Sequence, residues 1–330
     1  MKMLIIKLML ALLFIPLVTG SAMGPQPEEL TGPQLCYSER PSSHLELEEL
    51  FSSHNYGWGT LDDGIPSIFL EALPSDLDRI PQVQKKKIVF FLSLLPVVLR
   101  ANEEIREHKT TLTDLLRRYD QGETLTGNEL ARLSAITTEY RVSGDPLEDL
   151  QTRETLLMRV DTLPTSLVLA QAATESAYGT SRFARLGNNL FGEWTFTPGT
   201  GMVPLDRPEG RTYELRCFSS IYESVASYMN NLNTHRAYTS LREQRARMRA
   251  EGRPLQGIVL AAGLTRYSER GEDYVKQIRT IIRSNRLHRL GSILFRQNRA
   301  AETEETAPFS AGLLSSAAPS SRLSALRKNP

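Results

Sequence analysis

The chain has 330 residues, of which 40% are hydrophobic, so it can bury a sizeable core as one large domain or two small ones. Its formal net charge of +1 at pH 7 argues against a role that depends on overall charge, such as wrapping nucleic acid. No repeat with a period of about 20 to 50 residues is visible, which argues against a repeat architecture.

Residues 1–22 have the pattern of a secretory signal peptide. Lys2 and Lys7 form a short basic region before the apolar run Leu8–Val18, and Gly20 and Ala22 offer cleavage sites. The run is too short and too early for an ordinary membrane span, although an uncleaved signal anchor stays an alternative. No Cys follows the run directly, so we do not expect a lipoprotein. We predict an exported protein of the periplasm or cell envelope, with a membrane contact only through such an anchor.

The two cysteines of the chain are Cys36 and Cys217. An oxidising periplasm would allow them to pair, but cysteines so far apart are more often unpaired, so both alternatives stay open. Neither has metal-ligand spacing, and the five histidines are scattered. We expect no metal and no organic cofactor.

The first half of the chain is predicted to be helical after an irregular start. Residues 23–67 are rich in Pro, Ser and Glu, which predicts a partly ordered lead-in and not a domain. Residues 68–150 form a predicted helical region, because apolar clusters and charges alternate there at helical spacing. Within it, Asp76–Tyr119 should contain at least two helices, with Pro96 marking a kink or break, and another helix should follow the loop at Gly122–Gly127. The segment Phe90–Leu99 is apolar nearly all round and should be buried.

One carboxylate stands out at the end of an apolar segment. Leu167–Ala173 is a run of small and apolar residues that predicts a buried helix, and Glu175 follows it, just before a loop punctuated by glycine. An apolar setting disfavours the ionised form of a carboxylate, so the pKa of Glu175 should rise, as a general acid requires at neutral pH. The alternative is a helix-end glutamate in a surface ion pair with Arg182 or Arg185.

Three runs in a fixed order carry a family resemblance: AQAATESAYGTSRFA at 170–184, NNLFGEW at 188–194 and GLTRYSERGEDYVKQI at 263–278. They resemble the glucosaminidase domain of bacterial cell-wall hydrolases. The resemblance implies a mainly α (α+β) fold, with a lysozyme-like catalytic domain over 151–292 that has a small β-hairpin lobe. It further implies that Glu175 is the catalytic acid, and that Tyr267 faces the cleft near it, although the spacing around Tyr267 departs from the family's usual pattern.

Other residues of these runs are candidates for binding the sugar chain. Asn188 and Asn189 suit either sugar hydroxyl and N-acetyl groups or the backbone of their own loop. Phe191 and Trp194 have aromatic faces for pyranose rings; packing is favoured for Phe191, and Trp194 is the better subsite candidate because of its polar N–H. Tyr274 is a further candidate for binding, although packing is favoured for it.

Two short strands, about 201–206 and 211–217, are predicted to form the hairpin of the lobe. In many relatives a second acidic residue on this lobe assists the attacking water, but no glutamate clearly occupies the expected place here. The nearby candidates are Asp206, Glu209, Glu214 and Glu193. Glu209 is more simply a turn residue, and Glu214 an outward strand position. With two carboxylates their separation would decide between retention and inversion; with one, the N-acetyl group of the substrate becomes the natural participant.

We therefore predict an exported endo-β-N-acetylglucosaminidase that cleaves the β-1,4 bond after N-acetylglucosamine in the glycan strands of peptidoglycan. Lytic transglycosylase chemistry and a non-catalytic wall-binding module are the alternatives. Basic residues are in excess over 236–299, which suits either an anionic wall or a solvated face, and without a reader motif we expect no nucleic-acid partner. Residues 293–330 predict a disordered tail rich in Ser and Ala.

Overall fold

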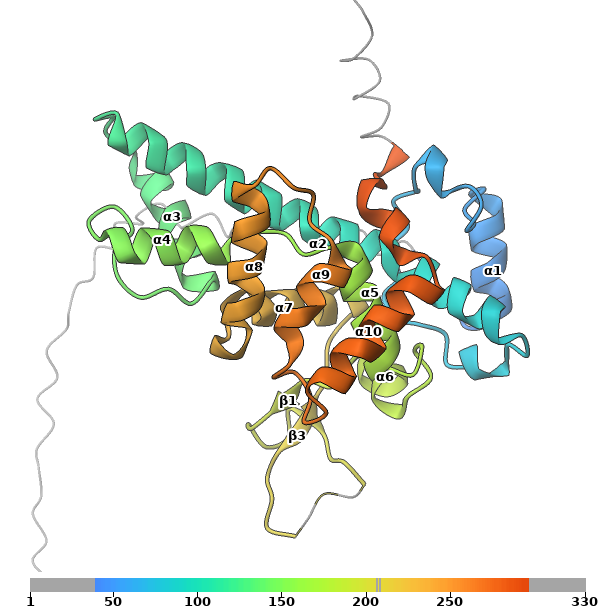
Figure 1. Cartoon of the computed structure of the whole chain (residues 1–330). Helices are drawn as coiled ribbons and strands as arrows, with labels where there is room; N and C mark the ends of the chain where they lie inside the picture. Colours follow the sequence, from blue (N-terminus) through green and yellow to red (C-terminus); the bar gives the residue numbers. More distant parts are fainter. Residues whose placement is uncertain (1–38, 206, 208, 297–330) are drawn as a thin grey trace, which may run out of the picture. The chain divides into compact units, whose positions relative to one another are not determined.

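A computed structural model describes residues 39–205, 207 and 209–296, and Figure 1 shows their arrangement. The predicted signal peptide, Cys36 and Asp206 lie outside the described residues. The α-helices are α1 (His44–Ser53), α2 (Val83–Asp120), α3 (Gly127–Glu139), α4 (Leu150–Arg159), α5 (Thr165–Glu175), α6 (Arg182–Gly187), α7 (Ile221–Thr234), α8 (Thr239–Ala250), α9 (Gly257–Leu260) and α10 (Glu272–Ser284). The strands are β1 (Trp194–Thr195), β2 (Gly201–Met202) and β3 (Glu214–Arg216). The predicted fold class, mainly α with a small β-lobe, is confirmed.

Helix α2 continues through a proline at which the sequence predicted a kink or break. It runs from Val83 to Asp120 with Pro96 inside it, so the predicted break is wrong. Proline has no N–H to donate to the carbonyl one turn earlier, which here is that of Leu92. The Tyr56 hydroxyl donates to this carbonyl oxygen at 2.9 Å. Tyr56 therefore supplies the hydrogen bond that Pro96 cannot make, and the predicted burial of Phe90–Leu99 is confirmed.

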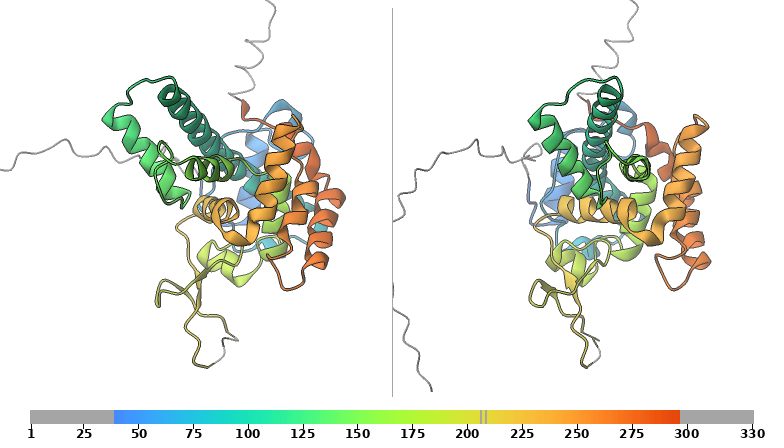
Figure 2. Two further views of the ribbon diagram at one scale, coloured as in Figure 1. Left: turned by 60° about the vertical axis from the view of Figure 1, so that its left-hand side comes forward. Right: turned by 90° about the vertical axis from the view of Figure 1, so that its left-hand side faces the viewer.

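Helix α5 is the buried centre of the described residues. All its residues from Thr165 to Ala173 are buried, because small side chains allow neighbouring helices to approach closely on every side. It packs against α2, α9 and α10, and Figures 1 and 2 show α10 beside it. Since α2 also packs on α7, the helices before and after residue 150 share one core.

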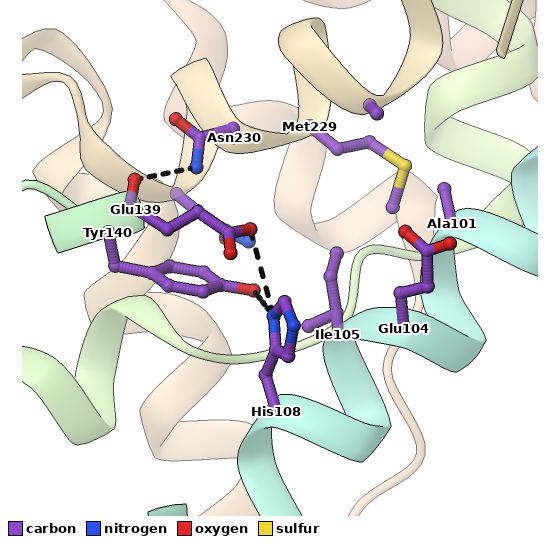
Figure 3. Close-up of a pocket in the computed structure, with 10 residues that line it drawn as sticks. Ala101, Glu104, Ile105, His108, Glu139, Tyr140, Met229 and Asn230 are labelled. Atoms are coloured by element: carbon purple, nitrogen blue, oxygen red, sulfur yellow. Dashed lines mark hydrogen bonds and ion pairs between the residues drawn. The ribbon is translucent and has the colours of Figure 1, made fainter. Parts of the chain in front are cut away.

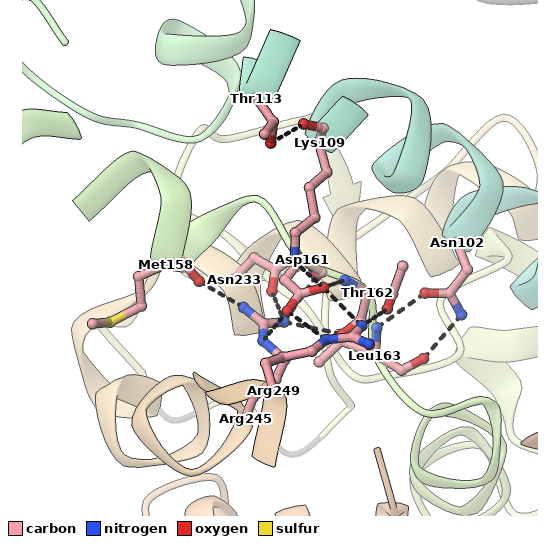
Figure 4. Close-up of polar contacts among 10 residues, drawn as sticks. All are labelled: Asn102, Lys109, Thr113, Met158, Asp161, Thr162, Leu163, Asn233, Arg245 and Arg249. Carbon is pink, nitrogen blue, oxygen red and sulfur yellow. Dashed lines mark hydrogen bonds and ion pairs between the residues drawn. The ribbon is translucent and has the colours of Figure 1, made fainter. Parts of the chain in front are cut away.

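A buried ion cluster joins α8 to the segment between α4 and α5 (Figure 4). The Asp161 carboxylate lies 2.9 Å from Lys109 Nζ and 3.0 Å from a terminal nitrogen of Arg249. Arg245, which is fully buried, donates to the Asp161 backbone oxygen at 2.8 Å and to Asn233 Oδ1 at 2.6 Å. Burial alone would raise the pKa of Asp161, but the surrounding cations hold it below its usual value. The cluster therefore stays ionised and fixes the helices around it.

The small sheet has the order β1-β3-β2, with β3 antiparallel to both neighbours. The predicted hairpin is present as the pair β2 and β3, in which Gly201 lies opposite Arg216. A Cβ at Gly201 would lie 2.3 Å from the Leu215 carbonyl oxygen, so only glycine fits there. In Figures 1 and 2 this sheet and its loops project from the helices.

The C-terminal end of the described chain pairs with the N-terminal part. Ile65 N–H donates to the Leu294 oxygen at 2.9 Å, and Arg296 N–H donates to the Ile65 oxygen at 2.9 Å. Phe295 is 4% exposed. Residues 293–296 thus belong to the fold, although the tail was predicted to begin at 293. Among the helices of the described residues, none has both the length and the hydropathy to cross a membrane.

Candidate active site

Glu175 is the last residue of α5, where the chain leaves the core. The next residues turn sharply, because Ala177, Tyr178 and Gly179 all have positive φ values. A Cβ at Gly179 would lie 2.7 Å from a Leu73 methyl group, so glycine is required for this turn to pack. The turn leaves the Glu175 side chain half-buried at the end of an apolar helix.

A chain of hydrogen bonds holds the Glu175 carboxylate. The Tyr274 hydroxyl donates to Glu175 Oε1 at 2.8 Å, and Gln171 Nε2 donates to the Tyr274 hydroxyl oxygen at 3.0 Å. The Tyr228 hydroxyl in turn donates to Gln171 Oε1. Gln171 precedes Glu175 by one helical turn, so both side chains lie on one face of α5. Tyr274 is only 2% exposed, so its ring offers no free face to a substrate. Its hydroxyl, held by Gln171, orients the Glu175 carboxylate.

The setting of Glu175 favours its protonated form. Burial raises the pKa of this carboxyl above its usual value, and this effect outweighs the Tyr274 hydrogen bond and the charge of Arg270, which both lower it. This is the direction expected from the apolar helix. A raised pKa is what a carboxyl needs in order to act as a general acid and deliver a proton to a departing oxygen.

Tyr267 links the acid to the loop at 188–194. Its ring is parallel to that of Tyr274, with the centroids 5.3 Å apart, and its hydroxyl donates to the Phe191 carbonyl oxygen at 3.1 Å. Burial raises its pKa well above the usual value, so the phenol stays protonated. Tyr267 is half-buried. The structure thus places Tyr267 and Tyr274 close to Glu175; the resemblance implied such a place for Tyr267, whereas packing was favoured for Tyr274.

The two asparagines of the loop hold the backbone. Asn189 is buried, and its Nδ2 donates to the carbonyl oxygens of Glu193 and Arg216 at 2.8 and 2.9 Å. Asn188 ends α6 with φ +50°, and its Nδ2 donates to the Phe218 oxygen at 3.3 Å. Of the two roles left open by the sequence, these contacts give both residues the structural one.

The two aromatic residues of the loop differ in exposure. Phe191 is 3% exposed and its ring stacks on Tyr228, with centroids 3.8 Å apart, so it offers no face to a sugar. These contacts give Phe191 the packing role that the sequence favoured, and not a role in binding the sugar chain. Trp194 is 57% exposed, although its ring stacks on Tyr213 and lies 6.5 Å, centroid to centroid, from the tilted ring of Phe196, so part of its surface is accessible to a ligand.

The candidates for a second acid fall in different places. Asp206 lies outside the described residues, and Glu209 is exposed. Glu214 accepts backbone N–H bonds from Gly199 and Gly201, which lower its pKa, so it holds the sheet and its loop. Neither Glu209 nor Glu214 contacts the group around Glu175 in any interaction that the structure records among its described residues.

Glu193 is the acid that faces the same tyrosines as Glu175. Burial raises its pKa, outweighing a 2.9 Å hydrogen bond from the Ser227 hydroxyl and the charge of Arg216. Burial, together with the charges of Glu193 and Glu175, raises the pKa of Tyr238 to about 12. The Oε1 atom of Glu193 is buried and has no hydrogen-bond partner among the described residues.

Sequence reasoning did not assign a site role to Gln171, Tyr228 or Tyr238. Gln171 did leave a signal, because it is a polar side chain one turn before the acid in an otherwise apolar run. The two tyrosines carry no comparable signal, since tyrosines at helical spacing in this stretch fit ordinary packing.

Another pocket lies between α2, the end of α3 and α7 (Figure 3). His108 Nδ1 lies 3.4 Å from the Tyr140 hydroxyl and 3.6 Å from Glu139 Oε1 at its wall. Its volume is about 40 Å³, whereas ligand pockets ordinarily measure roughly 300 Å³ or more, so it does not fit a sugar ring. Among the described residues no three His, Cys, Asp or Glu side chains are placed to hold a metal ion.

Residues 153–287 match the family named Glucosaminidase, described as mannosyl-glycoprotein endo-beta-N-acetylglucosaminidase. Over 199 residues the chain is 35% identical to Protein bax of Escherichia coli (strain K12). The matched residues make up 60% of this chain and 69% of that protein. The chain belongs to the glucosaminidase family. No solved structure matches it significantly. Glu175, Tyr267, Tyr274 and the loop at 188–194 all lie within the range that matches the glucosaminidase family, and the resemblance drawn from the three runs is confirmed.

Proposed function

We propose that the chain is an exported peptidoglycan hydrolase that cleaves the β-1,4 bond after N-acetylglucosamine, with Glu175 as the general acid. Membership of the glucosaminidase family supports glycosidase chemistry on an N-acetylglucosamine polymer. Export rests on the signal pattern of residues 1–22. The observation that carries the proposal is the half-buried Glu175 carboxyl, which has a raised pKa and a fixed hydrogen bond from Tyr274.

The chemistry follows from these contacts. Glu175 passes its proton to the glycosidic oxygen as the bond between that oxygen and the sugar C1 breaks. Tyr274 donates to Oε1 and thereby stabilises the carboxylate that remains. The positive charge that develops at C1 is quenched by water, or first by the N-acetyl oxygen of the substrate and then by water.

Glu193 is our proposal for the group that acts on this water. Its Oε1 is a buried acceptor without a partner among the described residues, and a buried acceptor of this kind is ordinarily satisfied by a water molecule. Its negative charge acts on Tyr238 and Tyr267, as does that of Glu175. The Asn189 side chain fixes the backbone of Glu193 through two hydrogen bonds. Asn189 Oδ1 accepts from the Glu193 N–H at 3.0 Å, and Asn189 Nδ2 donates to the Glu193 carbonyl oxygen at 2.8 Å.

The test is digestion of purified peptidoglycan by the wild type and by Glu175→Gln. We expect the variant to fold and to lose about 10²- to 10⁴-fold in turnover, the range that a general acid contributes. Glu193→Gln should lose less, and Glu209→Gln, which changes an exposed acid of the same lobe, is the matched control. Wild-type turnover by Glu175→Gln would remove Glu175 from the mechanism.

Mass spectrometry of the new chain ends separates the alternatives. Reducing N-acetylglucosamine ends support the hydrolase. Anhydro-muramic ends would assign a lytic transglycosylase, which needs a single acid and base. Retained binding without any release would assign a non-catalytic wall-binding module.

A further inference from the structure

A groove of about 430 Å³ lies between α6 and the small sheet. Arg182 and Phe183 form one side, and Trp194, Leu205 and Tyr213 are among the residues of the other. Its volume lies within the ordinary range of ligand pockets, roughly 300 to 1,000 Å³. We refer to it as the α6 groove.

The wall of the α6 groove is an exposed aromatic platform. The rings of Trp194 and Tyr213 are nearly parallel, at 13° with centroids 4.5 Å apart, so Tyr213 stacks against Trp194 and supports its ring. Trp194 is 57% and Leu205 is 84% exposed. Apolar groups gathered in this way at a groove mark a binding surface, and a flat aromatic face with a polar N–H at its edge suits the apolar face of a sugar ring.

The rim of the α6 groove is cationic. The Arg182 guanidinium donates to the Val203 oxygen at 3.3 Å and lies over the Phe183 ring, while Arg207 donates to the Tyr213 oxygen at 3.1 Å. The Glu214 carboxylate, which binds backbone N–H groups of the sheet, partly offsets the charge of Arg207, so Arg182 is the main cation of the rim. The rim therefore complements a ligand that carries carboxylates beside its sugar rings.

We propose that the α6 groove binds a second sugar unit of the glycan strand, away from the bond that is cleaved, with the ring on Trp194 and acidic substituents of the strand near Arg182. The identity of the ligand rests on the proposed function. Two chain connections place the groove next to the Glu175 centre: Trp194 directly follows Glu193, and Arg182 begins the helix after the Glu175 turn. The groove would lengthen the stretch of polymer that the protein holds.

The chain has two tryptophans, which gives a direct test. In the full chain carrying Glu175→Gln and Trp58→Phe, Trp194 is the single tryptophan. Titration with a neutral hexamer of N-acetylglucosamine should shift its emission to shorter wavelength and protect it from acrylamide quenching. Unchanged emission at saturating hexamer would overturn the proposal, and so would a response to an acidic peptide such as polyglutamate without any response to the hexamer.

Variants locate the binding. Tyr213→Ala should weaken hexamer binding about tenfold, because it removes the ring that supports Trp194. Leu186→Ala, which changes an exposed apolar residue of α6 outside the groove, should leave hexamer binding unchanged. Arg182→Gln should weaken sedimentation with peptidoglycan sacculi at low salt and leave hexamer binding intact. If Tyr213→Ala and Leu186→Ala, both folded by circular dichroism, bind the hexamer equally well, the groove proposal is overturned as well.

The two proposals fail separately. If the wild type releases no fragments from peptidoglycan but the hexamer still reaches Trp194, the proposed hydrolase is wrong and the groove stands. If cleavage is normal and Trp194 does not respond, the groove proposal alone is wrong.

Discussion

Glu175 derives its character from two opposed effects on one carboxyl group. Burial at the end of α5 raises its pKa, and the hydrogen bond from Tyr274 lowers it. The same hydroxyl both orients the acid and stabilises its ionised form, so the protein holds the proton less tightly than burial alone would. Tyr267 stacks on Tyr274 but sends its own hydroxyl to the Phe191 carbonyl, which makes the two tyrosines distinguishable by mutation.

Tyr274→Phe should move the alkaline limb of the pH profile of kcat/KM to higher pH. The variant removes a bond that stabilises the carboxylate, so the pKa of Glu175 rises further, and a general acid is active below its pKa. The measurement is the pH dependence of fragment release. Tyr267→Phe is the control, since its hydroxyl does not contact Glu175; its activity should fall while the limb stays in place. A shift of the Tyr274→Phe limb to lower pH would contradict this account.

At the scale of an element, α2 tolerates a proline because a distant side chain completes it. The Leu92 carbonyl has lost the N–H of residue 96 and accepts the hydroxyl of Tyr56 instead. Both groups are buried, so without Tyr56 the carbonyl would be an unpaired acceptor in the core.

Tyr56→Phe should lower the free energy of unfolding by about 1 to 3 kcal/mol, the cost of a buried unpaired polar group. In a Pro96→Ala background the helix regains its own donor, so the same change should cost clearly less. Urea denaturation of the four proteins in this double-mutant cycle gives the coupling. Equal costs in both backgrounds would show that the hydroxyl does not compensate for the proline.

At the scale of the molecule, the last described residues, 293–296, bind to the segment before α2. Beyond the pairing of Ile65 with Phe295, the Arg296 guanidinium donates to the backbone oxygens of His54 and Asn55 at 2.8 and 2.9 Å. Together these contacts tie the region before α2 to the segment after α10. They lie in what the sequence predicted as lead-in and tail, two regions whose composition gave no sign of a shared structure.

A chain ended after Ser292 should therefore be less stable, by about 3 to 5 kcal/mol, because it loses the buried side chains of Ile293 and Phe295. The measurement is urea denaturation followed by circular dichroism. A chain ended after Ala300 keeps every one of these contacts and is the control. Equal midpoints for the two truncated chains would mean that the pairing with Ile65 contributes little.

The sequence by itself determined what local patterns encode. Small and apolar residues at helical spacing predicted the buried helix that carries Glu175, and an apolar setting for a carboxylate predicted the direction of its pKa. Alternation of residues predicted the hairpin, and three ordered runs predicted the family.

Only the tertiary structure decided which groups meet. Tyr228, Gln171 and Tyr274 form one hydrogen-bonded chain although the last two are 103 residues apart, and Tyr56 reaches α2 from outside it. The sequence likewise could not assign the amides of Asn188 and Asn189 to backbone or to ligand, nor foresee that Phe191 stacks on Tyr228. The physical reason is that periodicity reports which face of an element is apolar, whereas the partner of a polar group depends on which elements pack together.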